Sequence, residues 1–285
     1  MPTRSGRAHA AILRPSAAGR LIEVGRTEPA DDLAGLVDYF WWVRWNTAEI
    51  HDQEVVPRPV VHLSAEVVAG VPRLLVHGVH PHMFTRRLDG AGHTVAAGFR
   101  PAGFRPFLRG DVAALVGREV TALEVLGVDD REAAERALGC ARPEDGAVVL
   151  AAWLRALEPQ PDPLVPRLAR LVEQAEEDSS LVRAAQLADL AGVSLRTLQR
   201  WFASHVGIGP KWVVQRFRLL DATAAAHEGR DVDWAALAAR LGYADQSHLI
   251  RAFTQLVGHP PAHYAREVAH QVVPAGTTTR RRPPA

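Results

Sequence analysis

The sequence predicts an α+β protein of two domains: an N-terminal small β-barrel or sandwich with flanking helices, and a C-terminal all-α domain. Three observations support this prediction. Short runs of β-branched and aromatic residues, separated by glycine and proline, fill the first half of the chain. A proline-rich stretch follows at residues 158–166, and a helical segment is repeated beyond it. A length of 285 residues suits two domains of moderate size.

The composition is that of a globular protein, with 47% hydrophobic and 23% charged residues. Its 33 basic and 32 acidic residues nearly cancel, so the net charge of +1 does not point to nucleic acid. The single Cys140 excludes an internal disulfide framework and a cysteine-based metal cluster. No apolar run is long enough to span a bilayer, and residues 1–20 hold no secretory signal. We therefore expect a soluble, cytoplasmic protein with no membrane partner.

The N-terminal half divides into an arm and a folded domain. Residues 1–20 are basic and marked by glycine and proline, as in a loosely ordered arm. Residues 21–157 form the domain to which we assign sensing or dimerisation. Its expected strands share β-branched and aromatic residues and lie at residues 39–45, 55–56, 60–63, 73–76 and 94–99. Its expected helices follow the strands, at residues 111–116, 131–138 and 147–157.

A linker and then a helical domain complete the chain. The four prolines of residues 158–166 cannot continue a helix and favour an extended spacer. The helical domain covers residues 167–268. It begins with an amphipathic helix at 167–177, and a long helix at 211–227 connects its two repeated units. The polar, proline-bounded residues 269–285 predict a disordered basic tail.

The repeated units share apolar, glycine and arginine positions. The offset between them is 50 residues before the turn, from 192 to 242, and 51 after it, from 198 to 249. The matched pairs are Leu187 with Leu237, Ala188 with Ala238, Gly192 with Gly242, Leu198 with Leu249, Arg200 with Arg251, Phe202 with Phe253, Gly207 with Gly258 and Pro210 with Pro261. A pattern that survives such a shift indicates two copies of one supersecondary unit.

Each unit predicts a helix, a tight turn and a second helix. Gly192 follows the last periodic apolar residue of the first helix, where a left-handed residue ends a helix. Ser194 stands where the N-cap of the next helix belongs, and Asp233 and Asp245 are the expected caps in the second unit. Two helices joined by a short turn with glycine, the second showing arginine and glutamine outward, are typical of the DNA-binding helix-turn-helix.

The second helix of each unit carries side chains that suit DNA. Arginine can pair with guanine, and glutamine with adenine, through two hydrogen bonds, and a capped helix N-terminus suits a phosphate. We predict that double-stranded DNA is bound by Ser194, Arg196, Thr197, Gln199, Arg200, Gln246, Ser247, Ile250 and Arg251. The alternatives are a bundle with a solvated charged face and a helical module whose arginines meet an acidic protein. The duplication favours DNA.

A longer pattern runs through the second unit and the connecting helix. Its residues are Arg218, Leu219, Ala222, Ala238, Gly242, Tyr243, Asp245, Ser247, Leu249, Arg251, Phe253, Gly258, Pro261, Tyr264 and Arg266, the last one place late. Through this pattern, residues 167–266 resemble the DNA-binding domain of AraC/XylS-type transcriptional regulators. Thr254 departs from it, because the family usually has lysine there. The resemblance implies a sequence-specific regulator, usually an activator that contacts RNA polymerase, although a repressor would share these features.

The N-terminal half resembles the sensing domains that precede such DNA-binding domains, through His77-Gly78-Val79 and residues 99–108. The resemblance implies a cupin-like barrel, and a homodimer is a possible assembly. Aromatic residues that line a barrel can hold a small organic effector. The residues assigned to that effector are Trp42, His62, Phe99 and Arg100. For each aromatic ring the alternative is a place in the core.

The histidines of the N-terminal half suggest an alternative function. The protein would then be a cupin-like metal-dependent enzyme, or an effector-binding protein with an accessory helical domain. His80-x-His82 has the spacing for two imidazoles on one face of a strand. However, the cupin metal pattern needs a glutamate shortly afterwards, residues 83–87 contain none, and Pro81 interrupts the strand. The sequence also lacks a glycine-rich phosphate loop, a Gly-x-Ser-x-Gly elbow and a His-Glu-x-x-His motif. We therefore expect no metal, no cofactor and no catalytic residue.

Overall fold

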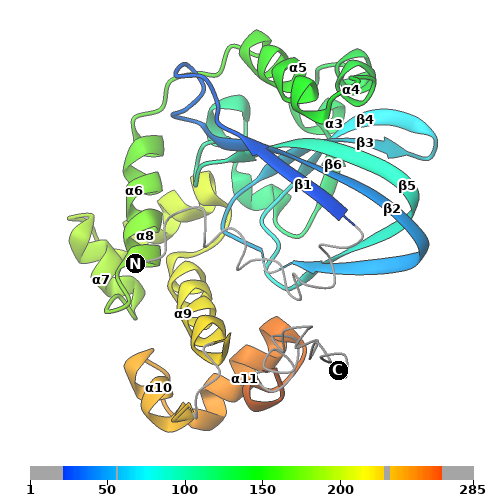
Figure 1. Cartoon of the computed structure of the whole chain (residues 1–285). Helices are drawn as coiled ribbons and strands as arrows, with labels where there is room; N and C mark the ends of the chain where they lie inside the picture. The colour runs from blue at the N-terminus through cyan, green and yellow to red at the C-terminus, as the bar shows by residue number, and fades with distance from the viewer. Residues whose placement is uncertain (1–21, 56, 228–231, 265–285) are drawn as a thin grey trace, which may run out of the picture.

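The computed structural model describes residues 22–55, 57–227 and 232–264. An antiparallel sheet with helices forms the N-terminal part, and helices alone form the C-terminal part (Figure 1). This is the α+β, two-part architecture that the sequence predicts. The expected arm at residues 1–20, the tail at 269–285 and Arg266 lie outside the described residues.

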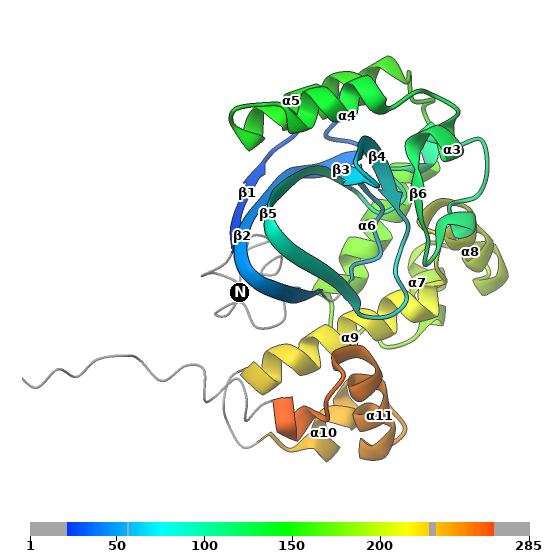
Figure 2. The same cartoon turned by 90° about the vertical axis from the view of Figure 1, so that its right-hand side faces the viewer.

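The sheet has six strands in the order β1-β2-β5-β3-β4-β6, and its paired strands are antiparallel. Their bounds are β1(Ile22–Thr27), β2(Val37–Val55), β3(His62–Val68), β4(Val71–His77), β5(Phe84–Phe99) and β6(Glu119–Thr121). The two longest strands, β2 and β5, bend together along their length, and this gives the sheet a strong curvature (Figure 2). The described strands thus form one curved sheet, and the alternative of a two-sheet sandwich is wrong.

Sequence patterns located the strand centres better than their ends. The predicted strand at residues 39–45 is only the middle of β2, which continues through polar residues to Val55 because it pairs with β5 along that length. A register shift between Thr47 and His51 marks a bulge in this pairing. Strand β1 was not predicted. Its residues alternate only weakly in burial, and its place at the sheet edge rests on pairing with β2.

Short helices cover one face of the sheet. Their bounds are η1(Arg105–Phe107), η2(Val112–Leu115), α3(Ala122–Leu126), α4(Arg131–Leu138) and α5(Pro143–Ala156). The α4 bounds match the prediction, whereas the helix expected at 111–116 is the 3-10 turn η2. Helix α5 begins four residues earlier than expected because Pro143 occupies its first turn, where no amide hydrogen is needed. The N-terminal core lies between the sheet and α4 and α5 (Figure 2).

The C-terminal part contains only helices. Their bounds are α6(Leu164–Glu177), α7(Ala184–Leu190), α8(Leu195–Trp201), the π-helical turn η3(Phe202–Val206), α9(Pro210–His227), α10(Trp234–Arg240) and α11(Gln246–Val257). Helix α6 starts inside the predicted linker 158–166, because Pro163 precedes it and Pro166 lies in its first turn. The connecting helix expected at 211–227 is α9, which runs between the two helix pairs (Figures 1 and 2).

Ion pairs and hydrogen bonds join the N-terminal part to the helices. Arg100 Nη1 lies 3.0 Å from Glu173 Oε1 of α6, and Arg58 pairs with Glu176 of the same helix. Farther along, Arg216 Nη2 of α9 donates to the carbonyl oxygen of Pro81, at 2.9 Å. The two parts are therefore in direct contact along α6 and α9.

Candidate nucleic-acid interface

The first helix pair consists of α7 and α8, and its turn has the predicted chemistry. Gly192 has φ +61°, the left-handed conformation expected after the first helix. The Ser194 hydroxyl accepts a hydrogen bond from the Thr197 amide at 3.1 Å, which confirms Ser194 as the N-cap of α8. This hydrogen bond fixes the N-terminus of α8, where the first backbone N–H groups have no partner within the helix.

Apolar side chains set the orientation of α8. Leu198 and Phe202 are fully buried, at 0% exposure. They belong to a first helical cluster, whose buried residues are Ala102, Val165, Leu168, Leu171, Val172, Ala175, Leu181, Leu187, Ala188, Ala191, Leu198, Phe202, Val206, Val213, Val214 and Phe217. Because that face of the helix is buried, Arg196, Gln199 and Arg200 are exposed on the other side.

The second helix pair, α10 and α11, repeats this arrangement. Asp233 accepts from the amides of Ala235 and Ala236, both at 3.0 Å, and Asp245 accepts from the His248 amide at 2.7 Å. Both predicted caps are confirmed. The buried residues of the second helical cluster are Leu219, Ala222, Leu237, Ala238, Leu241, Tyr243, Leu249, Phe253, Leu256 and Tyr264.

The polar face of α11 differs from that of α8. Gln246, Ser247 and Arg251 are exposed, but Ile250 is partly buried. The predicted DNA-contacting residues thus form two groups, one on each second helix. The group on α8 has the greater number of long side chains with several donors.

The two pairs contact each other near their turns. Gly242 has φ +76°, and a Cβ built on it would lie 2.6 Å from the Cβ of Val182, just before α7. At the matching Gly192 nothing lies within 4 Å. Glycine at 242 is therefore required twice, for its backbone conformation and for close packing.

Helix α9 is fastened to α6 by a buried arginine. Arg218 is 1% exposed, and its Nη2 and Nη1 donate to the carbonyl oxygens of Ala175 and Asp178 at 2.6 and 3.0 Å. These carbonyls end α6, where a helix lacks internal donors. Arg218 belongs to the sequence pattern of the connecting helix, and this contact gives that arginine a structural role.

A polar cluster lies on the face of the sheet that the helices leave uncovered. His62 pairs in register with His77, and His77 pairs with Glu119, so their side chains share one face. His77 Nε2 lies 3.2 Å from Glu66 Oε1, and His77 Nδ1 lies 3.5 Å from Glu119 Oε1. Arg86 also pairs with Glu66.

Opposing effects set the charges of this cluster. Burial favours neutral His77, but its hydrogen bonds to Glu119 and Glu66 outweigh burial and raise the pKa of His77 to about 9. Burial opposes ionisation of Glu66 as well, yet His77, Arg86 and Ser64 lower the pKa of this carboxyl to about 2. Burial, followed by the nearby His77 and Arg58 charges, lowers the pKa of His62 to about 3. The cluster thus holds charged His77, Arg86, Glu66 and Glu119 beside the neutral imidazole of His62.

The four residues assigned to an effector do not form one site. Trp42 and Phe99 pack with the N-terminal core, and Phe99 is 1% exposed. His62 lies on the opposite face, where it accepts a hydrogen bond from Trp41 Nε1 at 3.3 Å. Arg100 donates to the carbonyl oxygen of Ala34 at 2.7 Å and pairs with Glu173 at the contact with α6. This separation disagrees with one shared effector site.

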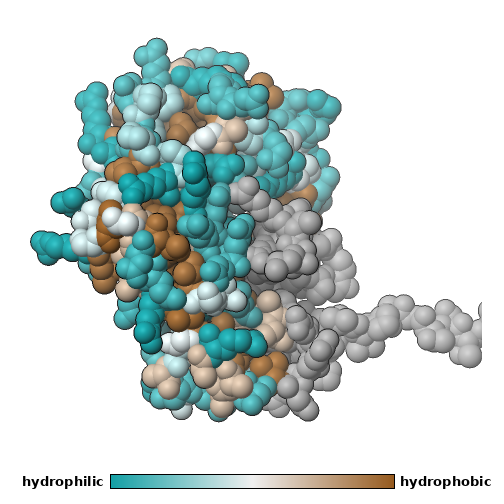
Figure 3. Space-filling view, turned by 90° about the vertical axis from the view of Figure 1, so that its left-hand side faces the viewer, coloured by the Kyte–Doolittle hydropathy of each residue, from teal (hydrophilic) through white to brown (hydrophobic). Residues whose placement is uncertain are grey.

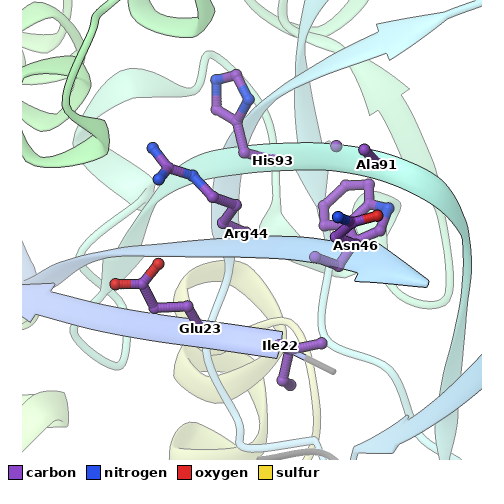
Figure 4. A pocket seen from close by; sticks show the side chains of 8 residues that line it. Ile22, Glu23, Arg44, Asn46, Ala91 and His93 are labelled. Carbon is purple, nitrogen blue, oxygen red and sulfur yellow. The ribbon is translucent and has the colours of Figure 1, made fainter. Parts of the chain in front are cut away.

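A surface hollow lies elsewhere, where β1, β2 and β5 meet (Figure 4). Its lining residues are Ile22, Glu23, Arg44, Trp45, Asn46, Ala91, Gly92 and His93. None of the four assigned effector residues is among them. Because the hollow is open and its lining is as polar as it is apolar, it offers little of the enclosed apolar surface that a small organic ligand requires.

The outer surface of the C-terminal part mixes polar and apolar side chains. On the face that bears α6, α7 and α8, hydrophobic surface gathers in a band among hydrophilic residues (Figure 3). Leu190 of α7 and Leu195 of α8 are exposed to 54% and 39%. In the described residues, no helix has both the length and the apolar character to cross a membrane.

Several residues that form the polar cluster on the sheet or the contacts between elements could not be recognised from the sequence around them. Glu66, Glu119 and Arg216 stand among ordinary polar positions, and strand pairing or helix packing alone brings each to its partner. Val182 likewise carries no pattern that foretells its contact with the turn at Gly242. Only a residue-by-residue contact prediction could have found them.

Comparison with known proteins agrees with this geometry. The family described as "Helix-turn-helix domain" matches residues 187–267, and a domain of unknown function (DUF6597) matches residues 25–121. A putative AraC-like transcription regulator of Streptomyces lividans is 34% identical over 114 residues, which are 40% of this chain and 36% of that protein. The chain thus spans about a third of the length of this curated relative.

Two solved structures overlap with the chain. A probable AraC family transcriptional regulator from Rhodopseudomonas palustris is 22% identical and covers 34% of this chain and 93% of its own, with a TM-score of 0.31. ToxT from Vibrio cholerae is 10% identical and covers 86% of this chain and 97% of its own, with a TM-score of 0.39. Scores of this size do not establish a shared fold.

The capped helix pairs and the family match define the region from residue 187 to residue 267 as a helix-turn-helix domain. The chain is similar to a putative AraC-like transcription regulator, which agrees with the AraC/XylS-type resemblance found in the sequence.

Proposed function

We propose that the protein is a sequence-specific DNA-binding transcriptional regulator in which both helix pairs are DNA-binding helix-turn-helix units. The observation that carries the proposal is the repeated geometry of α8 and α11. Each begins at a capped N-terminus, buries one apolar face and exposes arginine and glutamine on the other. Capped helix starts bind phosphate, and these side chains bind base edges in the major groove.

The proposed DNA contacts are those predicted from the sequence. Arg196, Gln199 and Arg200 of α8 bind bases, and Arg251 of α11 mainly binds phosphate. We expect α9 to hold the two helices about one turn of DNA apart, ~34 Å along the duplex. Exposure of these side chains supports the assignment.

The N-terminal part, residues 21–157, has the sensing or dimerising role in this proposal, and residues 167–268 bind DNA. The direct contacts of the N-terminal part with α6 and α9 support a controlling role, because a change in the sheet would act on the helices that carry the DNA-binding units. A cupin-like barrel, a small organic effector, a homodimer and activation through RNA polymerase in the cytoplasm complete the proposal. Repression would need the same DNA contacts.

Binding of the full-length chain to genomic duplex fragments tests the function. Fragments are selected from a genomic library, and their affinity is measured by fluorescence anisotropy at several salt concentrations. Affinity should fall steeply with salt, with a log–log slope of roughly 0.9 per phosphate contact. Arg196→Ala combined with Arg200→Ala should weaken selected fragments more than unselected ones.

Arg136→Ala is the matched control, because Arg136 is an exposed arginine of α4 whose side chain is 66% accessible. It removes one positive charge away from the proposed interface, whereas the double variant removes two. The proposal fails if no fragment shows salt-sensitive binding, or if the double variant binds selected DNA as the control does.

A further inference from the structure

Three potential metal ligands meet at the end of the sheet. His77 ends β4, Glu119 begins β6, and these two residues are direct cross-strand partners. His80 follows in the loop after β4. One ligand atom from each of the three lies within 4.8 Å of the others.

The imidazole of His77 is oriented by its second nitrogen. His77 Nε2 lies 3.2 Å from Glu66 Oε1 and 2.7 Å from Ser64 Oγ. His77 Nδ1 therefore faces the other way, 3.5 Å from Glu119 Oε1. Histidines that bind metals usually donate their other ring nitrogen to a carboxylate in this way, which fixes the ring and strengthens the ligand.

His80 supplies a nitrogen that the described residues leave without a hydrogen-bond partner. Its Nε2 is buried, and its ring lies against Phe84, with 4.9 Å between the ring centroids. A buried polar nitrogen without a partner destabilises the fold, so its position calls for a ligand. A bound cation would satisfy it.

We propose that His77, His80 and Glu119 bind one divalent transition-metal ion, with zinc as the best match. Zinc accepts two imidazoles and one carboxylate in a tetrahedral site and leaves the fourth position for water or another ligand. Glu119 is exposed, which gives the ion a path from solvent. Glu66 acts through His77 as a positioning residue.

This group differs from the pair that the sequence suggested, His80 and His82, which has no glutamate just beyond it. In the structure His82 is exposed and outside the group of three. The carboxylate comes instead from β6, which antiparallel pairing with β4 brings to His77.

The loop that carries His80 also contacts the helices. Pro81 accepts a hydrogen bond from Arg216 of α9 at 2.9 Å, and Met83 packs against the second helical cluster. A metal ion that holds His80 would therefore fix the loop on which α9 and the second helix pair rest. This consequence rests on the proposed function, whereas metal binding itself does not.

Metal binding is tested with full-length, untagged protein freed of metal by a chelator, without DNA. Titration calorimetry with zinc alone should give one ion per chain. Both His80→Ala and Glu119→Gln should weaken it at least tenfold, on the order of the loss for an orienting partner. Cobalt in place of zinc should give the intense visible absorption of tetrahedral coordination, and Glu119→Gln should reduce it.

His82→Ala is the matched control, since it removes an exposed histidine of the same loop. The site is refuted if wild-type protein takes up no stoichiometric zinc, which would make the cluster an ionic network only. It is also refuted if His82→Ala weakens zinc binding as much as the ligand variants do. Glu119→Gln decides the question if circular dichroism shows that His80→Ala does not fold, because Glu119 lies at the surface.

The link to the helices is tested separately, by the DNA affinity of wild-type protein and Glu119→Gln with and without zinc. A zinc-dependent change in wild type alone supports the link. Unchanged wild-type affinity overturns the link, while calorimetry still decides the metal site.

Discussion

The two helix pairs share one sequence repeat, but the fold holds them in different ways. His205 in the first unit corresponds to Leu256 in the second, at the same offset of 51 that relates 198 to 249. His205 Nε2 lies 3.0 Å from Asp162 Oδ2, in the segment that joins the two parts of the chain. Leu256 is 4% exposed and belongs to the second helical cluster. One position thus serves as a tether in one unit and as core in the other.

Within the part of the chain that the structure describes, the first unit has contacts of several kinds with its surroundings. Its cluster includes Ala102 from the N-terminal part, and Arg167 of α6 lies over the Trp201 ring, 4.9 Å from the centroid. Among the described residues, the contacts that hold the second unit include those of α9, Val182 and Met83. The difference teaches that equal local patterns do not give equal mechanical roles. The first unit contacts the N-terminal part through Ala102, and the second contacts it through Met83 and through α9.

The largest effect on stability is expected when a matched core leucine in each unit is replaced by alanine. Leu198→Ala and Leu249→Ala both truncate side chains of 0% exposure, and each should lower the free energy of unfolding by roughly 2–5 kcal/mol. Leu198→Ala should cost more, because its cluster is larger and reaches into the N-terminal part. Urea denaturation followed by circular dichroism measures both. A greater loss from Leu249→Ala would reverse the comparison.

The matched turn glycines give the next largest contrast. Gly192→Ala should cost about 1–2 kcal/mol, the penalty for a Cβ in the left-handed conformation. Gly242→Ala should cost about 1–3 kcal/mol more, because the new Cβ would also meet Val182. Thermal and urea unfolding of the two variants provide the measurement, with wild type as reference. Equal losses would mean that Val182 can move aside and that the two pairs are not tightly packed.

DNA specificity should differ between the units as well. Arg200→Ala should cost roughly 1–3 kcal/mol in binding and relax the preference at one base pair. Arg251→Ala should weaken all sequences more evenly, because the exposed polar face of α11 has fewer side chains able to distinguish bases. A randomised-site selection with each full-length variant tests this. Stronger relaxation from Arg251→Ala would assign base recognition to the second unit.

Weakening the contact between Asp162 and His205 should have the smallest effect on stability. Asp162→Asn weakens the contact with His205 and should cost about 1 kcal/mol of stability or less, as for one hydrogen bond at a partly exposed site. Asp129→Asn, at a carboxylate with 71% side-chain exposure, is the control for the charge change. Urea unfolding compares the two. A loss no greater than the control's would show that His205 does not fasten the first unit.

Local chemistry determined much of the C-terminal part from the sequence. The caps at Ser194, Asp233 and Asp245 and the left-handed glycines at 192 and 242 act over a few residues, so their sequence spacing is enough to predict them. Helix bounds were less certain where proline stood, because a first-turn proline and a helix-breaking proline look alike until the helix start is known.

Only the tertiary structure decided the contacts between distant residues. The long polar end of β2 is a strand because β5 pairs with it, and Glu119 meets His77 because β6 pairs with β4. The same long-range packing separated Trp42, His62, Phe99 and Arg100. It also gave the equivalent positions 205 and 256 different roles, since His205 contacts Asp162 and Leu256 lies in the second helical cluster. Such pairings depend on how the whole chain closes on itself. Residue type and spacing in a short window therefore do not determine them.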